Sequence, residues 1–209
     1  MTPLQAANAA LREQRHDDAI RGYLRILLTT PTLGQFIHTN LQLARRRYRA
    51  ARRQAERPRV QVCGCDLAQN AAGRAHTLAQ LYEPLAEVSI LGAIFPHPNR
   101  TGLWPPLGAS RIPIRAFPAD GGDFPAQAVL HVLDQPADLV HLSKPRMPNI
   151  LFGILYKLVW GARILVDIDD EDLAFVNAET PLHLEDYLHR HVRLPPLDEL
   201  TKGDWTRLG

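Results

Sequence analysis

The spacing of hydrophobic residues changes near residue 58. Before this point apolar side chains recur every three or four residues, which predicts two helices over residues 4–30 and a third over about 33–56. After it, short apolar runs alternate with helical patterns. The sequence therefore predicts an N-terminal α-helical segment with a linker helix, residues 1–57, and an α/β domain, residues 58–209.

The α/β region contains five short apolar runs separated by helical patterns. Strands are expected at 60–63, 88–91, 112–116, 139–142 and 164–166. This alternation is typical of a right-handed, doubly wound (Rossmann-like) parallel sheet. Ligands of such sheets bind beyond the carboxyl ends of the strands, so we expect the working face there.

The first two predicted helices carry a small residue at Ala19, an aromatic residue at Tyr23 and a terminal proline at Pro31. This spacing resembles a tetratricopeptide repeat, although Ala10 stands where a large residue is usual. A single repeat cannot bury its own apolar face. We therefore expect a cap or docking helix pair, with a possible protein partner bound through residues 1–57.

The third predicted helix is rich in arginine. One interpretation is a patch for anionic lipid or nucleic acid, and the other is the solvated face of a linker helix, since no pattern of interleaved aromatic residues and no heptad repeat accompanies the arginines. A membrane-surface contact stays open on this basis. The arginines are Arg45, Arg46, Arg47, Arg49, Arg52 and Arg53.

Composition narrows the class of protein only a little. A formal charge of +2 over 209 residues is too mild to predict a nucleic-acid partner. Cys63 and Cys65 are too close for a strain-free disulfide and too few for a zinc site, which predicts a reduced, cytoplasmic compartment. The most apolar window, residues 149–168, contains charged residues, so no membrane span is expected.

Two loops at the predicted carboxyl ends of strands carry basic residues. Asn70, Gly73 and Arg74 precede or open a helix, where backbone amides bind anions, or where a glycine simply allows close packing. Arg74 is unfavourable in a first helical turn unless it meets an anion or a carboxylate. Lys144 and Arg146 stand beside prolines 145 and 148, which we expect to hold the preceding residues extended. They would contact a phosphate or neutralise the acidic run that follows.

That acidic run, DIDDED, follows the last predicted strand. Asp167 and Asp169 are spaced to share a divalent ion, as in metal-dependent transferases and phosphatases. They are equally suited to accept hydrogen bonds from sugar hydroxyls, and the carboxylates after them suit a helix cap. Trp104 would stack on a sugar or lipid, or be pinned between loop and core.

Three stretches together resemble the N-terminal half of group 1 glycosyltransferases with the GT-B fold: NAAGRAHTLAQLYEPLAEVSILG, DLVHLSKPR and GARILVDIDDEDLAF. The resemblance implies that this half holds a sugar or glycan acceptor, without an essential metal or other cofactor. Which residues would be catalytic is unknown from the sequence. The residues that carry it, or that we expect to bind the acceptor, are Asn70, Gly73, Arg74, His141, Lys144, Arg146, Asp167 and Asp169.

In that family a second Rossmann-like half binds the nucleotide-sugar donor. No such half is found in the sequence to Gly209, so we expect a truncated or split enzyme that is inactive alone. Two alternatives stay open. One is a noncatalytic interaction module built on the tetratricopeptide-like segment and an α/β scaffold. The other is a metal-dependent transferase or phosphatase that uses Asp167 and Asp169.

Overall fold

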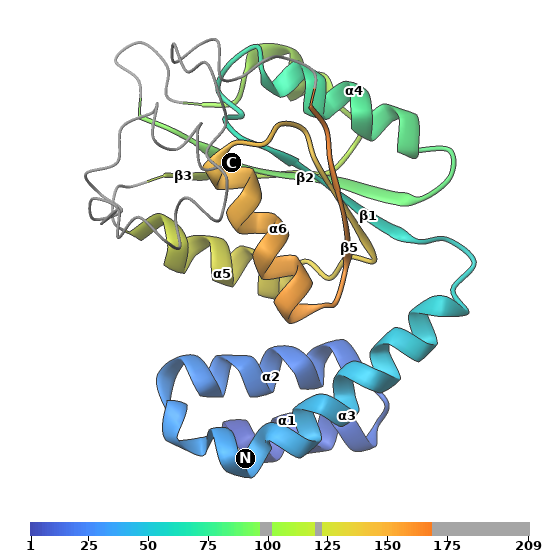
Figure 1. Cartoon of the computed structure of the whole chain (residues 1–209), viewed down its shortest axis with the longest axis vertical. Coiled ribbons are helices and arrows are strands. Elements are labelled where there is room, and N and C mark those ends of the chain that lie inside the picture. The colour runs from blue at the N-terminus through green and yellow to red at the C-terminus, as the bar shows by residue number, and fades with distance from the viewer. Residues whose placement is uncertain (97–101, 120–122, 169–209) are drawn as a thin grey trace, which may run out of the picture.

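The structure is a computed structural model that describes residues 1–96, 102–119 and 123–168 (Figure 1). The helices and strands follow in the order α1 (Pro3–Arg12), α2 (His16–Thr29), η1 (Pro31–Leu33), α3 (Gly34–Arg53), β1 (Arg59–Gly64), α4 (Ala72–Tyr82), β2 (Glu87–Ile94), η2 (Pro105–Ala109), β3 (Ile114–Pro118), α5 (Phe124–Asp134), β4 (Leu139–Leu142), α6 (Met147–Val159) and β5 (Arg163–Val166).

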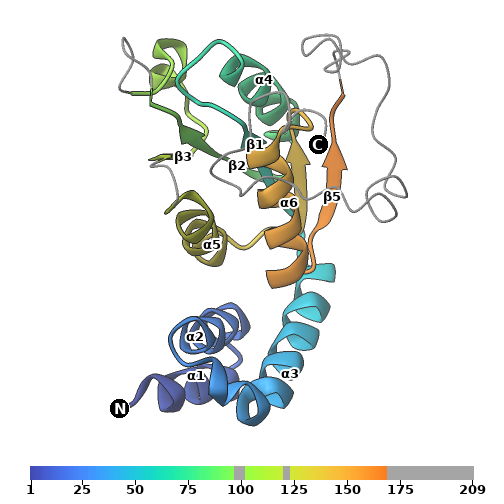
Figure 2. The same ribbon diagram turned by 60° about the vertical axis from the view of Figure 1, so that its left-hand side comes forward.

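The five strands form one parallel sheet in the order β3-β2-β1-β4-β5. At its centre Val62 of β1 pairs with Ile90 of β2 on one side and with His141 of β4 on the other. Helix α4 covers one face of the sheet, and α5 and α6 cover the other (Figure 2), so that the buried side chains form a cluster on each side. The prediction of an α/β fold with a doubly wound, Rossmann-like sheet and an N-terminal helical segment is confirmed.

Helices α1 and α2 pack closely because small residues face each other. A Cβ added at Gly22 would lie 2.9 Å from the Cβ of Ala7. Ala19 and Tyr23 are fully buried, and the Tyr23 hydroxyl donates to Asn8 Oδ1 at 2.6 Å. Small, buried residues are needed wherever two helices pack closely, so these contacts are not specific to a tetratricopeptide repeat. The resemblance to that repeat stays a prediction.

The helical segment docks on the α5 and α6 side of the sheet and shares its hydrophobic core. The Asp138 carboxylate, just before β4, accepts a hydrogen bond of 2.8 Å from Arg52 Nη2 of α3 and another of 2.8 Å from the backbone N–H of Arg59. Trp160, at the end of α6, donates to the Val132 carbonyl at 2.8 Å and packs against Tyr48 of α3. Residues 1–57 are therefore part of the same packed body as the sheet.

None of the helices in the described part of the chain combines the length and apolar character needed to cross a membrane.

Candidate functional site

An ion pair joins α4 to the end of β5 across the carboxyl edge of the sheet. Arg74 Nη2 lies 2.6 Å, and Nε 2.7 Å, from Asp167 Oδ2. The Asp167 N–H donates to the Leu142 carbonyl at 2.9 Å, which fixes the carboxylate beside β4. Arg74 thus meets a carboxylate in the first turn of α4, where its charge would otherwise oppose the helix dipole.

A second polar pair lies on the same face of the sheet. The hydroxyl of Tyr82, the last residue of α4, is 2.9 Å from Nδ1 of His141 in β4, and the two rings meet edge to face. Burial lowers the pKa of His141, the Arg74 charge acts in the same direction, and the Asp167 charge opposes both. The imidazole is therefore held mainly neutral at pH 7, close enough to the Arg74–Asp167 pair to sense its charges.

The loop before α4 explains the glycine at position 73. Its N–H donates to the Asn70 carbonyl at 2.9 Å, which closes the turn. A Cβ at Gly73 would lie 3.2 Å from Cζ3 of Trp104, so a side chain there would crowd the ring. Trp104 is half-buried against the α4 side of the core. These contacts fit the interpretation in which the glycine allows close packing and the tryptophan is pinned between loop and core.

Lys144 and Arg146 lie in the loop that joins β4 to α6, at the same edge of the sheet. The Lys144 carbonyl accepts a hydrogen bond of 2.9 Å from the buried Asn149 side chain, and Arg146 is extended, with φ −97° and ψ 150°. The expectation that Pro148 holds the preceding residue extended is wrong. Met147 begins α6, and Pro148 occupies the first helical turn, where a missing N–H leaves no hydrogen bond unmade.

Asp167, the first ligand of the metal interpretation, is already paired with the Arg74 guanidinium through Oδ2. Asp169 lies outside the described residues. Within those residues, no group of three or more histidine, cysteine, aspartate or glutamate side chains is arranged to hold a metal ion.

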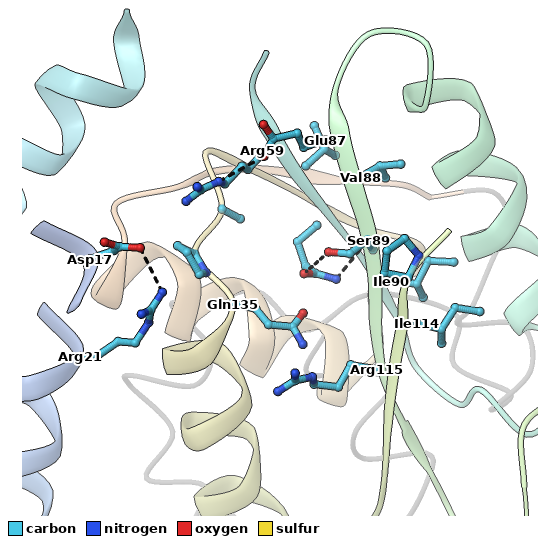
Figure 3. A pocket seen from close by; sticks show the side chains of 15 residues that line it. Asp17, Arg21, Arg59, Glu87, Val88, Ser89, Ile90, Ile114, Arg115 and Gln135 are labelled. Carbon is cyan, nitrogen blue, oxygen red and sulfur yellow. Dashed lines mark hydrogen bonds and ion pairs between the residues drawn. The ribbon is translucent and has the colours of Figure 1, made fainter. Parts of the chain in front are cut away.

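Sequence reasoning missed a cavity of about 430 Å³ at the opposite, amino-terminal edge of the sheet (Figure 3). It lies between α2 and strands β1 to β3, so no single motif could have indicated it. Two of its arginines are already paired: Arg21 with Asp17 at 3.1 Å, and Arg59 with Glu87 at 3.3 Å. Because ligands of open parallel sheets bind at the other edge, we keep the Arg74–Asp167 region as the candidate site.

Comparison of the chain with protein-family models, with curated proteins and with solved structures found no match. The fold and the site therefore define the class of protein: a Rossmann-like α/β protein with a paired arginine and aspartate at the carboxyl edge of its sheet.

Two partly buried histidines predict a loss of stability in mild acid. Burial lowers the pKa of His141 and of His131, which stacks on Phe117. Near and below about pH 6.5 these histidines therefore bind protons more readily in the unfolded chain than in the folded one. The free energy of unfolding is highest above this pH and falls as the pH drops through it. We expect a lower melting temperature at about pH 5.5 than at about pH 7.5. The variant His131→Gln/His141→Gln should show a smaller drop, and an equal drop would contradict this origin.

Proposed function

We propose that this chain binds the sugar acceptor of a glycosyl transfer reaction, as the acceptor-side half of a GT-B enzyme. The observation that carries the proposal is the Arg74–Asp167 pair, which joins the first turn of α4 to the end of β5, 93 residues away, at the carboxyl edge of the sheet. Gly73 and His141, which share the resemblance to that family, lie beside this pair in the fold.

The chemistry of the edge suits a polyhydroxyl ligand. A guanidinium donates and a carboxylate accepts, so Arg74 and Asp167 together can hydrogen-bond neighbouring hydroxyl groups of one sugar. The half-buried ring of Trp104 offers an apolar face of the kind on which sugars stack. Neutral His141, whose Nδ1 lies against the Tyr82 hydroxyl, can present Nε2 to a further sugar hydroxyl.

Sugar transfer also needs a bound donor. The described residues build one Rossmann-like unit, and in a GT-B enzyme a second unit holds the nucleotide-sugar. Reaction requires both substrates to be oriented in one cleft, so the proposal assigns acceptor binding, and not transfer, to this unit alone.

The test is binding of a panel of neutral mono- and disaccharides, followed by NMR of the full chain. We expect chemical-shift changes at Arg74, His141 and Asp167, and at least about tenfold weaker binding by Asp167→Asn, because a charged hydrogen bond would be lost. Glu56→Gln, which removes a carboxylate from an exposed position after α3, is the matched control and should bind like the parent chain. Equal binding by both variants would contradict the site. Magnesium binding that Asp167→Asn abolishes would favour the metal-dependent alternative instead.

A further inference from the structure

The arginines of α3 are concentrated on one side of the helix. At about 100° per residue, Arg45, Arg46, Arg49 and Arg53 fall within a sector of roughly 100°. We call these four residues the arginine face. Helix α3 contains no aspartate or glutamate. Within the described part of the chain, Arg52 is the α3 arginine that forms an ion pair, with Asp138, and no ion pair there involves the arginine face.

The crowded positive charges of the arginine face destabilise the fold. The Nε atom of Arg45 is buried without a hydrogen-bond partner among the described residues. Burial, and then the charge of Arg49, lower the pKa of Arg45. Like charges that lack carboxylates destabilise the compact state, and an anionic surface would relieve this repulsion.

The arginine face meets the turn that ends α6, a helix with exposed aliphatic side chains. A Cβ added at Gly161, in the turn that ends α6, would lie 3.3 Å from Cδ of Arg49. Three and seven residues earlier, Leu158 and Ile154 are 64 % and 52 % exposed, and Lys157 between them is also exposed. Helix α6, like α3, contains no acidic residue. Figure 1 shows α6 in front of the sheet and α3 in front of α1, so both helices lie on the near side of the molecule.

We infer that the arginine face and the outer side of α6 form a docking surface for an anionic phospholipid membrane. Clustered cations beside exposed aliphatic side chains match a bilayer surface, where the arginines meet phosphates and Leu158 and Ile154 enter the headgroup boundary. A nucleic-acid surface would instead call for aromatic or hydrogen-bonding groups among the cations, and α6 presents aliphatic ones. The contact is peripheral. It is independent of the proposed sugar site, which lies at the carboxyl edge of the sheet.

The test is sedimentation of the full chain with phosphatidylcholine vesicles, with or without about 30 % phosphatidylserine. We expect binding to the anionic vesicles alone, weakening as salt is raised. The variant Arg46→Gln/Arg49→Gln/Arg53→Gln should bind roughly 100-fold more weakly, at about fivefold per cation. Arg12→Gln/Arg111→Gln/Arg115→Gln removes the same charge from exposed positions outside this surface, and it should bind nearly as well as the parent chain.

A second pair of substitutions separates insertion from electrostatic attraction. Ile154→Gln/Leu158→Gln should weaken binding about tenfold without changing its salt dependence, because apolar burial and not charge is lost. Circular dichroism checks that each variant is folded. The inference is overturned if phosphatidylserine vesicles do not bind, if the two triple variants bind equally, or if RNA binds through the same arginines while vesicles do not.

Discussion

The substitution Gly92→Ala is expected to lower the free energy of unfolding by about 3 kcal/mol or more. Gly92 lies in β2 and pairs with Gly64 of β1. An added Cβ would press on the Gly64 carbonyl oxygen and lie 2.7 Å from Cγ of Leu67. The carbonyl belongs to the central strand of the sheet, and Leu67 is anchored by its N–H, which donates to the Ala93 carbonyl at 2.8 Å. The Gly64 carbonyl cannot move away without disturbing the pairing of β1 with β2, and the Leu67 side chain is fully buried, so it has little room to shift.

The matched control is Gly108→Ala in η2, where an added Cβ would meet no atom within 4 Å. We expect this substitution to change stability by no more than about 0.5 kcal/mol. Urea unfolding followed by circular dichroism measures both variants. Equal unfolding midpoints for the two variants would show that the sheet tolerates a side chain at the Gly64–Gly92 pair of β1 and β2, against the geometry described above.

The sequence pattern was sufficient for the presence of the strands, because each is a mainly apolar short run set apart from the helical patterns. It was less exact for their bounds: the third strand is Ile114–Pro118 and not 112–116. It was not sufficient for the way the helical segment packs. The contact between Arg52 and Asp138 joins residues 86 positions apart, and neither residue carries a local signal of its partner. Charge alone left the α3 arginines ambiguous, since a solvated helix and a lipid-binding helix share that composition. Our inference of a membrane surface depends on the turn that ends α6, which lies beside Arg49, and this contact exists only in the folded chain.

The candidate site, too, could be predicted from the sequence only in part. Arg74 in a first helical turn correctly indicated a nearby anion or carboxylate, because helix dipoles act locally. The identity of that carboxylate, Asp167, depends on β5 lying next to β4, which a spacing rule does not specify. The pairing of Tyr82 with His141 was missed for a similar reason. This pairing requires the last turn of α4 to lie over β4. The chain continues from α4 into β2, which is two strands away from β4 in the sheet.

The substitution Phe152→Ala is expected to cost about 3 to 5 kcal/mol of stability. Phe152 of α6 is fully buried, and its ring meets those of Phe117 in β3 and Phe124 in α5 edge to face, at centroid distances of 6.1 and 6.0 Å. Removing this ring leaves a cavity among α6, β3 and α5 and breaks two favourable aromatic contacts. Because α6 carries the apolar part of the proposed membrane surface, the loss would also loosen that surface.

Phe36→Ala removes the same atoms from α3, where the residue is 70 % exposed, and it should change the free energy of unfolding by no more than about 0.5 kcal/mol. Phe152→Leu retains most of the buried volume and should fall between the two alanine variants. Thermal and urea unfolding of all three provide the measurement. If Phe152→Ala were as stable as Phe36→Ala, α6 would not be held to the sheet by this aromatic cluster, and the packing described for the α5 and α6 face would be wrong.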